Sequence, residues 1–346
     1  MINSGSLYSR AGVDIEAADR AKLLMKKYVE STYNGSVVSG HGGFGGMYSL
    51  KELTGTNAIL VGSSDGVGTK LKLAFMTGRH NTIGQDLVNH CVDDILCCGA
   101  RPLFFFDYLG TGKIIPETVT QIIEGLSIAC KENDMALLGG ETAEMPGFYS
   151  EGEYDLAGFI VGWVEKDKVI DGSTIAPGDL LIGLESAGLH TNGYSLARQA
   201  FFEMAGMKPD DILSETSSTV GDELMKIHMS YLPVILALLD SGVIKGIAHI
   251  TGGGFKGNIN RIMPHDVTAI VKTSSWEVPG VFKAIARIAK VSSEEMYRVF
   301  NMGIGLVLIC DSTDYAAITK ETEKAGIRAY EIGYCDKGKE KVKLEF

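Results

Sequence analysis

The order of apolar and polar positions along the chain switches repeatedly between two periods. Short apolar runs predict strands, and segments in which apolar residues recur every three to four positions predict helices. In the first half, strands are expected at 57–63, 102–109, 134–139 and 155–164, and helices at 14–30, 84–98 and 116–132. In the second half, strands are expected at 179–185, 266–272, 304–311 and 328–335, and helices at 192–205, 222–241, 279–290 and 313–325. Both halves are therefore predicted to combine helices with a sheet, the α/β (α+β) class.

A turn-rich stretch divides the chain. Residues 171–179 read DGSTIAPGD and follow the last predicted strand of the first half. A chain of 346 residues is also long for a single core, because domains typically hold about 150 residues. We therefore expect two mixed domains, residues 1–170 and 171–346.

Composition and charge limit the kinds of molecule that the protein is expected to bind. The net charge of −11 argues against nucleic acid and against an anionic membrane surface. The six cysteines form no CxxC pair, and the chain starts without the apolar segment of a signal peptide. The longest apolar run, 232–239, is too short to span a bilayer. We expect a cytoplasmic protein, whose 43 clustered glycines indicate loops that approach a ligand closely.

The stretch Ser63–Lys70, SSDGVGTK, combines glycines, a hydroxyl and a lysine, but it does not fit the phosphate-binding pattern GxxxxGK[ST]. An acid, Asp65, stands near its front, soon after the apolar run 58–61. A carboxylate at a strand end can ligate Mg²⁺ while the following amides and Lys70 contact phosphates. A plain strand-to-helix turn is the alternative interpretation.

The predicted helix after this loop carries acids outside its apolar stripe. At about 100° per residue, three polar residues fall on the face opposite the stripe: Asp86, His90 and Asp93. Asp94 falls at the border, where a half-buried carboxylate needs a partner. Together with Asp65, Asp94 favours a divalent cation, because hard cations prefer oxygen ligands. For Asp86, a solvated helix face is an equally good interpretation.

A second acidic loop follows the predicted strand 134–139. It reads GGETAEMPG at residues 139–147, where glycines and a proline frame two acids. Glu141 is a candidate for a further metal or ligand contact. Glu144 is interpreted only as an acid of the loop.

Two glycine loops of the second half are similar in kind. SAGLHTNGYS, at 186–195, leads from a strand into a helix and places Thr191 and Asn192 near the helix start, where anions bind. HITGGG, at 249–254, also runs into a short helical segment. A histidine flanks each loop, and both are candidates for proton transfer: His190 and His249. No role is assigned to the histidines outside such loops, His228 and His265.

Six motifs occur in a distinctive order along the chain. They are SDGVGTK, DLVNHCVDDI, GARPLFFFDYLGTGK, GGETAEMPG, GLHTNGYSL and HITGGGF. In this order they closely resemble the aminoimidazole ribonucleotide synthetases, also called phosphoribosylformylglycinamidine cyclo-ligases, from about Tyr8 to the C-terminus. Two positions depart from the family pattern. Asp93 stands where an asparagine is usual, and Thr191 stands where a serine is usual, keeping the hydroxyl.

The resemblance implies a fold, an assembly and a set of ligands. The N-terminal α/β domain would bind ATP without a Walker loop, and its sheet would pair with that of a second copy in a homodimer. The C-terminal, sandwich-like α/β domain would contribute to the substrate site. ATP and Mg²⁺ are the expected cofactors, a ribotide is the expected substrate, and residues 42–46 would cover the nucleotide.

The resemblance also implies roles for individual residues. The expected ATP-binding residues are Gly43, Phe44, Gly45, Asp65, Gly66, Gly68, Thr69, Lys70 and Asp94, of which Asp65 and Asp94 would bind the metal. The expected substrate-binding residues are His190, Thr191, Asn192, Gly193, Thr251, Gly252, Gly253 and Gly254. The expected catalytic residues are His190, His249 and Glu141.

The implied reaction is the ATP-driven ring closure of formylglycinamidine ribonucleotide. The formyl amide oxygen attacks the γ-phosphate, and this oxygen leaves as phosphate when the amidine nitrogen closes the imidazole ring. Selenophosphate synthetase and thiamine-monophosphate kinase share the acid–glycine loop and are alternatives. A non-catalytic nucleotide-binding scaffold for the maturation of another protein is a further one. The chain has no cysteine before Cys91, which disfavours the selenophosphate synthetases, because these usually carry a reactive Cys or selenocysteine near the N-terminus.

Overall fold

The computed structural model describes residues 15–38 and 46–346. The chain forms two compact units. Unit 1 holds Met1–Cys91 and Pro102–Trp163, and unit 2 holds Val92–Arg101 and Val164–Phe346. The domain boundary expected near residue 170 stays a prediction. Within the described ranges, no helix is both long and apolar enough to cross a membrane.

Unit 1 is built on a four-stranded sheet in the order β1-β4-β2-β3. The strands are β1 (Ala58–Gly66), β2 (Arg101–Thr111), β3 (Ala136–Glu144) and β4 (Tyr154–Glu165), and β2 is parallel to β3. The helices are α2 (Ile15–Glu30), α3 (Leu71–Thr77), α4 (Asn81–Leu96) and α5 (Pro116–Glu132). The ends of α4, β2 and β4 that fall within residues 92–101 and 164–165 are assigned to unit 2.

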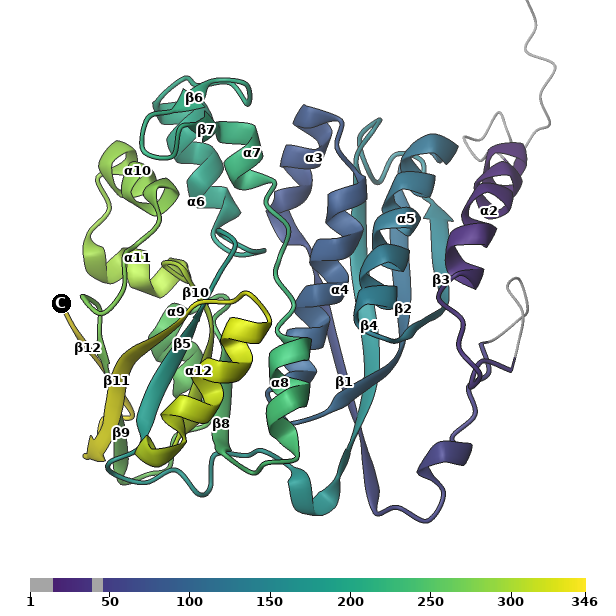
Figure 1. Ribbon diagram of the computed structural model, residues 1–346. Coiled ribbons are helices and arrows are strands. Elements are labelled where there is room, and N and C mark those ends of the chain that lie inside the picture. Colours follow the sequence, from purple (N-terminus) through teal and green to yellow (C-terminus); the bar gives the residue numbers. More distant parts are fainter. Residues whose placement is uncertain (1–14, 39–45) are drawn as a thin grey trace, which may run out of the picture. The chain divides into compact units, whose positions relative to one another are not determined.

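Helix α5 has the bounds that its sequence predicts. Pro116 occupies its first turn, where an N–H group would have no partner in the helix, and the acidic Glu117 lies near the positive end of the helix dipole. Helix α5 lies beside α4 on one face of the sheet (Figure 1). The two backbones come close at a glycine of each helix. A Cβ atom on Gly125 would collide with the carbonyl oxygen of Asn81, and one on Gly84 would collide with the backbone of α5.

The opposite face of this sheet is partly exposed and carries several large apolar side chains. Along β4, buried residues alternate with more exposed ones, among them Phe159, which is 47% exposed. Along β2, the half-buried Phe104 and Phe106 alternate with buried neighbours in the same way. Because successive side chains of a strand point to opposite faces, this alternation gathers the more exposed side chains on one face.

Unit 2 is built on a six-stranded sheet in the order β12-β9-β11-β5-β10-β8. The strands are β5 (Leu180–Glu185), β8 (Ile244–His249), β9 (Val267–Lys272), β10 (Ile304–Cys310), β11 (Ala329–Lys337) and β12 (Val342–Glu345). Neighbours are antiparallel, except that β12 is parallel to β9. A two-stranded sheet joins β6 (Ile212–Leu213) to β7 (Ser218–Thr219).

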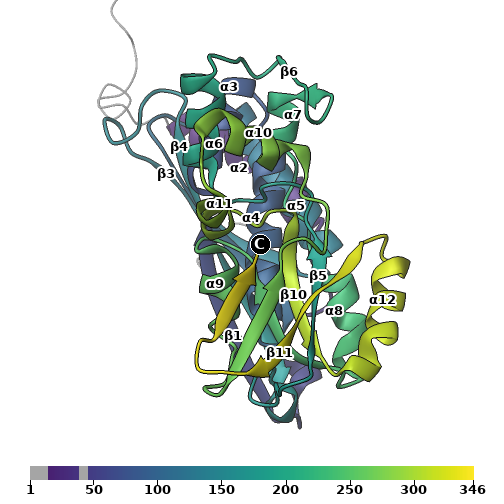
Figure 2. The ribbon, with the colours of Figure 1, turned by 90° about the vertical axis from the view of Figure 1, so that its left-hand side faces the viewer.

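Helices cover both faces of the six-stranded sheet. The helices of unit 2 are α6 (Tyr194–Arg198), α7 (Val220–Leu224), α8 (Leu232–Leu239), α9 (Gly254–Ile259), α10 (Gly280–Ala289), α11 (Ser293–Val299) and α12 (Tyr315–Lys324). Helices α8 and α12 contact each other on one face, and α9 lies against β8 and β12 on the other (Figure 2). The sheet is therefore the buried middle layer of unit 2.

Most predicted elements are confirmed to within a few residues, but the single helix predicted at 222–241 is wrong. The chain forms α7 and α8 here, separated by an irregular segment at 225–231. The hydroxyl of Thr219 caps α7 by accepting the N–H of Asp222, and Pro233 lies in the first turn of α8. Proline is tolerated in a first turn but breaks a helix interior, so the sequence itself signals the break.

Some elements of the structure lie outside the predicted set, among them α3, β8, α11 and β12. The helix predicted at 192–205 is formed by α6 and a following π-helical segment, Gln199–Met204. Strand β8 matters most for the site, because it ends at His249 and pairs this residue with Leu306 of the neighbouring strand β10.

Replacing Gly125 by alanine should destabilise the protein by about 1–3 kcal/mol, because the added methyl group forces α4 and α5 apart. Urea unfolding measures the difference. Gly35→Ala is the matched control in unit 1, since a Cβ atom there meets nothing within 4 Å. A Gly125→Ala protein as stable as this control would contradict the close contact of the two helices.

Candidate functional site

The acidic loop of unit 1 exposes several of its predicted ligand residues. The side chain of Asp65, near the end of β1, is 44% exposed, and Gly68 and Thr69 are exposed as well. One carboxylate oxygen of Asp65 accepts the N–H of Gly66 at 2.6 Å, and the other lies 2.7 Å from Nε2 of His90. A buried imidazole on α4 therefore orients the acid that the sequence selects as a metal ligand.

Lys70 lies in a different setting from the one expected of it. Its side chain is fully buried, and Nζ lies 2.8 Å from each carboxylate oxygen of Asp86, which is fully buried too. Burial lowers the pKa of Lys70, and the negative charge of Asp86 opposes that shift. In this structure Lys70 neutralises a buried carboxylate, in place of the open phosphate contact that the motif suggests.

The solvated-face interpretation of α4 is wrong. Three residues are expected opposite the apolar stripe, and all are buried: Asp86, His90 and Asp93. Each has a partner from another segment of the chain: Asp86 pairs with Lys70, His90 with Asp65, and Asp93 with His228. Pairing offsets the loss of hydration, and a helix with polar groups around its circumference can then be buried.

Glu141 is exposed on β3, opposite Tyr108 of β2. The adjacent residue of β2, Asp107, is only 6% exposed and pairs with Gly140. Burial raises the pKa of Asp107 to about 7, and the nearby charge of Glu141 adds to the rise. An exposed acid therefore lies beside a second acid that resists ionisation.

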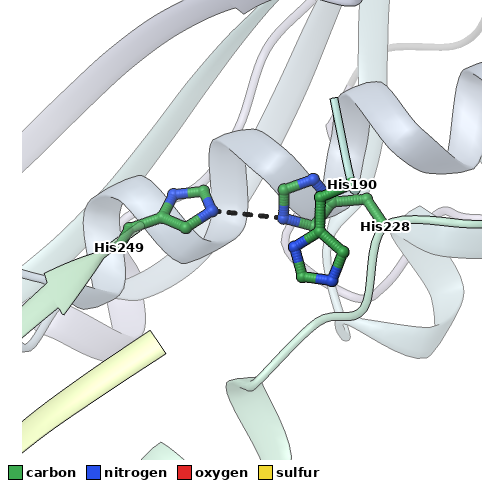
Figure 3. Close-up of side chains that lie close together, drawn as sticks. All are labelled: His190, His228 and His249. Atoms are coloured by element: carbon green, nitrogen blue, oxygen red, sulfur yellow. Dashed lines mark hydrogen bonds between the residues drawn. The ribbon is translucent and has the colours of Figure 1, made fainter. Parts of the chain in front are cut away.

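Three buried histidines meet in unit 2: His190, His228 and His249. One ring nitrogen of each histidine lies within 4.8 Å of one nitrogen of each of the other two (Figure 3). They come from the loop after β5, from the irregular segment between α7 and α8, and from the end of β8. The sequence motifs select His190 and His249 but not His228, because no glycine loop flanks it.

His249 and His228 are joined ring to ring. Nδ1 of His249 lies 2.9 Å from Oδ1 of Asp94, and its Nε2 lies 3.2 Å from Nε2 of His228. His228 also contacts Oδ2 of Asp93 through Nε2, at 3.2 Å, and the hydroxyl of Thr191 through Nδ1, at 3.4 Å. Two carboxylates thus flank two imidazoles, an arrangement that can hold and move a proton.

Asp93 is engaged inside this cluster. Its Oδ1 accepts the N–H of Tyr231 at 3.0 Å, and its Oδ2 contacts His228. Burial raises the pKa of Asp93 well above its usual range, and the Tyr231 N–H opposes the rise. With both oxygens bonded within unit 2 and its side chain fully buried, Asp93 is a fixed part of the cluster.

His190 is held in a different way. Its φ of 60° lies in the left-handed region, its Nε2 accepts the N–H of Ala187 at 3.3 Å, and its ring stacks on His228 with the centroids 4.0 Å apart. A backbone N–H can only donate, so Nε2 carries the lone pair and Nδ1 carries the proton. A metal would need that same lone pair. The geometry therefore favours a hydrogen-bonded cluster over a transition-metal site.

The two glycine loops of unit 2 lie side by side. A Cβ atom on Gly252 would meet Oδ1 of Asn192 at 3.4 Å. The side-chain amide of Asn258 holds the second loop by donating to three backbone carbonyls: Thr251, Gly252 and Gly254. Predicted substrate residues of both loops are therefore brought together by the fold.

A cavity of about 630 Å³ opens beside the second loop, within unit 2. Gly253 lines it together with two cations, Lys256 and Arg298, and two acids, Glu294 and Glu295. Its volume is that of a typical small-molecule site. The cavity can hold a ligand that carries both negative and positive groups.

The other predicted site residues have varied settings. Gly43, Phe44 and Gly45 lie outside the described residues. Gly66 ends β1. Gly193 precedes α6 with a φ of 79°, and a Cβ atom there would collide with the ring of Phe300. Only glycine at position 193 therefore allows the loop 186–193 to enter α6 in this way.

Two family models match the sequence. The N-terminal domain of the AIR synthase related proteins matches residues 47–164, and their C-terminal domain matches residues 176–345. A phosphoribosylformylglycinamidine cyclo-ligase of Alkaliphilus oremlandii (strain OhILAs) is 47% identical over 337 residues, which cover 97% of this chain and 99% of that protein. The chain belongs to the AIR synthase related family. This confirms the resemblance carried by the six motifs.

Solved structures share the fold of this AIR synthase related chain at much lower identity. A thiamine-monophosphate kinase from Stenotrophomonas maltophilia K279a superposes with a TM-score of 0.70 at 14% identity, over 96% of each chain. The hydrogenase maturation protein HypE in complex with ATP superposes with a TM-score of 0.67 at 18% identity, over 99% of this chain and 92% of that one. Both confirm the mixed α/β fold.

Replacing Asp107 by asparagine should flatten the pH dependence of stability. The pKa of this carboxyl rises from 3.8 to about 7 on folding, so the stability it contributes below pH 4 is lost as the pH rises to 7, by up to about 4 kcal/mol. The variant should gain stability over the wild type at pH 8 and not at pH 4, as measured by urea unfolding. Asp19→Asn, at an exposed position of unit 1, should leave the stability unchanged at both pH values. An equal difference at both pH values would refute the buried acid.

Proposed function

We propose that this protein catalyses the ATP-dependent ring closure of formylglycinamidine ribonucleotide to aminoimidazole ribonucleotide, with release of ADP and phosphate, in cytoplasmic purine biosynthesis. The identity of 47% to a named cyclo-ligase, over nearly the full length of both chains, carries the proposal. The cluster of histidines and carboxylates supports it, because all of its members except His228 lie on the motifs that carry the family resemblance.

The chemistry divides into two steps. The formyl oxygen of the substrate attacks the γ-phosphorus of ATP and displaces ADP, which converts a poor leaving group into a phosphate ester. The amidine nitrogen then attacks the activated carbon, and the carbon–oxygen bond breaks as phosphate departs. The residues of this chain contribute by positioning the reactants and by stabilising charge.

Asp65 and Asp94 are the proposed ligands of Mg²⁺. Each carboxylate is partly exposed, with side-chain exposures of 44% and 28%, and each is oriented by an imidazole through one oxygen. Oxygen donors of this kind fit Mg²⁺, which typically takes one or two protein carboxylates beside the phosphates of a nucleotide. Mg²⁺ would offset negative charge on ATP. Gly66, Gly68 and Thr69 remain the proposed nucleotide contacts, and Glu141 a further ligand contact.

Among the histidines, His249 is the proposed proton-transfer group. Its Nδ1 is bound to Asp94 and its Nε2 faces His228, so its orientation is fixed from both sides. His190, locked to Ala187 and buried, is better suited to order the loop that presents Thr191 and Asn192. Its predicted catalytic role therefore becomes a positioning role in the proposal.

The ribotide is proposed to bind along the two glycine loops of unit 2. Four residues of these loops are the main proposed contacts: Thr191, Asn192, Thr251 and Gly252. The cavity beside Gly253 supplies Lys256 and Arg298, whose positive charges suit a 5′-phosphate, and acids that suit an amidinium group. The substrate of the proposed reaction carries both kinds of group.

The proposed assembly is a homodimer formed through the sheet of unit 1. Its support is the apolar face that includes Phe104, Phe106 and Phe159, since exposed apolar patches commonly mark protein interfaces. A second copy of the chain would bury these aromatic side chains.

Release of ADP should require formylglycinamidine ribonucleotide together with ATP. Selenide, thiamine monophosphate or ATP alone should give no turnover, and chelation of Mg²⁺ should abolish it. A coupled ADP assay, with chromatographic detection of aminoimidazole ribonucleotide, measures the reaction. ADP release that ignores the ribotide would reject the proposed function in favour of a phosphotransferase or a maturation scaffold.

Asp94→Asn should lower kcat by about 100-fold or more while the melting temperature changes little, because the side chain is partly exposed and the amide keeps an acceptor for His249. Asp210→Asn, at an exposed position of the same unit, is the control for removing one negative charge. An Asp94→Asn enzyme with wild-type turnover would show that this carboxylate is dispensable.

Phe159→Arg should convert the dimer into a monomer, because a charge in the middle of a buried apolar interface is costly. Sedimentation velocity measures the mass. Leu23→Arg, on α2 and 73% exposed, should leave the assembly unchanged. A Phe159→Arg protein that remains dimeric would move the interface to another surface.

A further inference from the structure

His228 has a position that an ordinary core histidine seldom has. It is fully buried on the irregular segment between α7 and α8, and it contacts three separate segments of unit 2. These contacts are Asp93 at the end of α4, Thr191 in the first substrate loop, and His249 at the end of β8. Figure 3 shows the ring of His228 between those of His190 and His249.

The contact between His228 and His249 constrains the protons of both rings. Their Nε2 atoms lie 3.2 Å apart, so one nitrogen donates and the other accepts. His249 meets Asp94 through Nδ1, and a carboxylate accepts, so the proton of neutral His249 resides on Nδ1. Its Nε2 then carries the lone pair, and His228 must be the donor.

The other contacts of His228 complete the same pattern. With a proton on Nε2, His228 has its lone pair on Nδ1, where the hydroxyl of Thr191 can donate. Oδ2 of Asp93 and Nε2 of His249 lie at the same distance, 3.2 Å, from Nε2 of His228. The contacts of His228 with His249 and Thr191 are therefore consistent with one tautomer, in which Nε2 carries the proton.

We infer that His228 is a positioning residue: by donating from Nε2 to the lone pair of His249 it fixes the ring orientation of this histidine, whose tautomer Asp94 sets, and ties it to the Thr191 loop. The inference rests on the proposed function in so far as His249 is the group that transfers a proton. It adds a residue that the sequence motifs leave without a role. Partners that hold a functional histidine in this way commonly change activity by roughly 10–100-fold when removed.

Two variants of His228 separate positioning from packing. His228→Leu keeps much of the volume and removes both nitrogens. His228→Gln keeps an amide that can reach the place of Nε2 and donate to His249. His265→Leu, which removes an exposed histidine of the same unit, is the control.

The first readout is the ¹⁵N resonance of Nε2 of His249, followed by NMR of the histidine rings with the ATP- and substrate-free protein. Wild type, His265→Leu and His228→Gln should show the shift of an Nε2 lone pair that accepts a hydrogen bond, and His228→Leu should show the shift of one that has lost its donor. An unchanged Nε2 shift in folded His228→Leu would overturn the inference. If His228→Leu fails to fold, His228→Gln decides: the shift of an Nε2 lone pair without a donor in this variant would overturn the inference as well.

The second readout is kinetic. His228→Leu should lose roughly 10–100-fold in kcat with a KM for ATP within about twofold of wild type, and His228→Gln should recover at least about a third of the activity. Equal losses in the two folded variants would reduce His228 to a packing role. A wild-type protein without cyclisation activity would refute the proposed function alone, because the NMR readout does not depend on turnover.

Discussion

The burial of polar groups on α4 is the constraint on which the candidate site depends. Asp86, His90 and Asp93 lie inside the protein, where a charge or hydrogen-bonding group without a partner costs several kcal/mol. Each partner must therefore come from another segment held in place. The acidic loop provides Lys70 and Asp65, and the segment between α7 and α8 provides His228. Within each unit, the buried polar groups of α4 thus fix the side chains that contact them.

This constraint also explains why two carboxylates stay accessible. Asp65 and Asp94 are partly exposed, and each is bonded to an imidazole through one oxygen while the carboxylate retains further acceptor capacity. Each histidine sets the direction of an acceptor oxygen, in the same way that hydrogen-bond partners orient the ligands of many metal sites. The acidic protein can in this way attract a cation locally while its surface repels polyanions.

Much of this could be predicted from the sequence, but for uneven reasons. Periodicity gave α5 its bounds, and motif order gave the family, because both depend on residues close together in the chain. The burial of the polar face of α4 could not be predicted, and the solvated face weighed for Asp86 proves wrong, because periodicity reports only where a side chain points. It cannot report that Lys70 lies close enough to neutralise Asp86. His228 was missed because its partners come from distant segments, although Pro233 already signalled that the helix around it is interrupted.

The break between α7 and α8 has a consequence for how this part of the chain can evolve. Its two ends are anchored, by the capped helix α7 on one side and by Tyr231 on the other, where the N–H binds Asp93 and the hydroxyl binds the carbonyl of Glu185. The segment 225–231, which carries His228, lies between these two anchors. Substitutions on its outer side are tolerable, but the gain or loss of a single residue would withdraw the imidazole from all its neighbours at once. Its length should thus be more strictly maintained than its sequence.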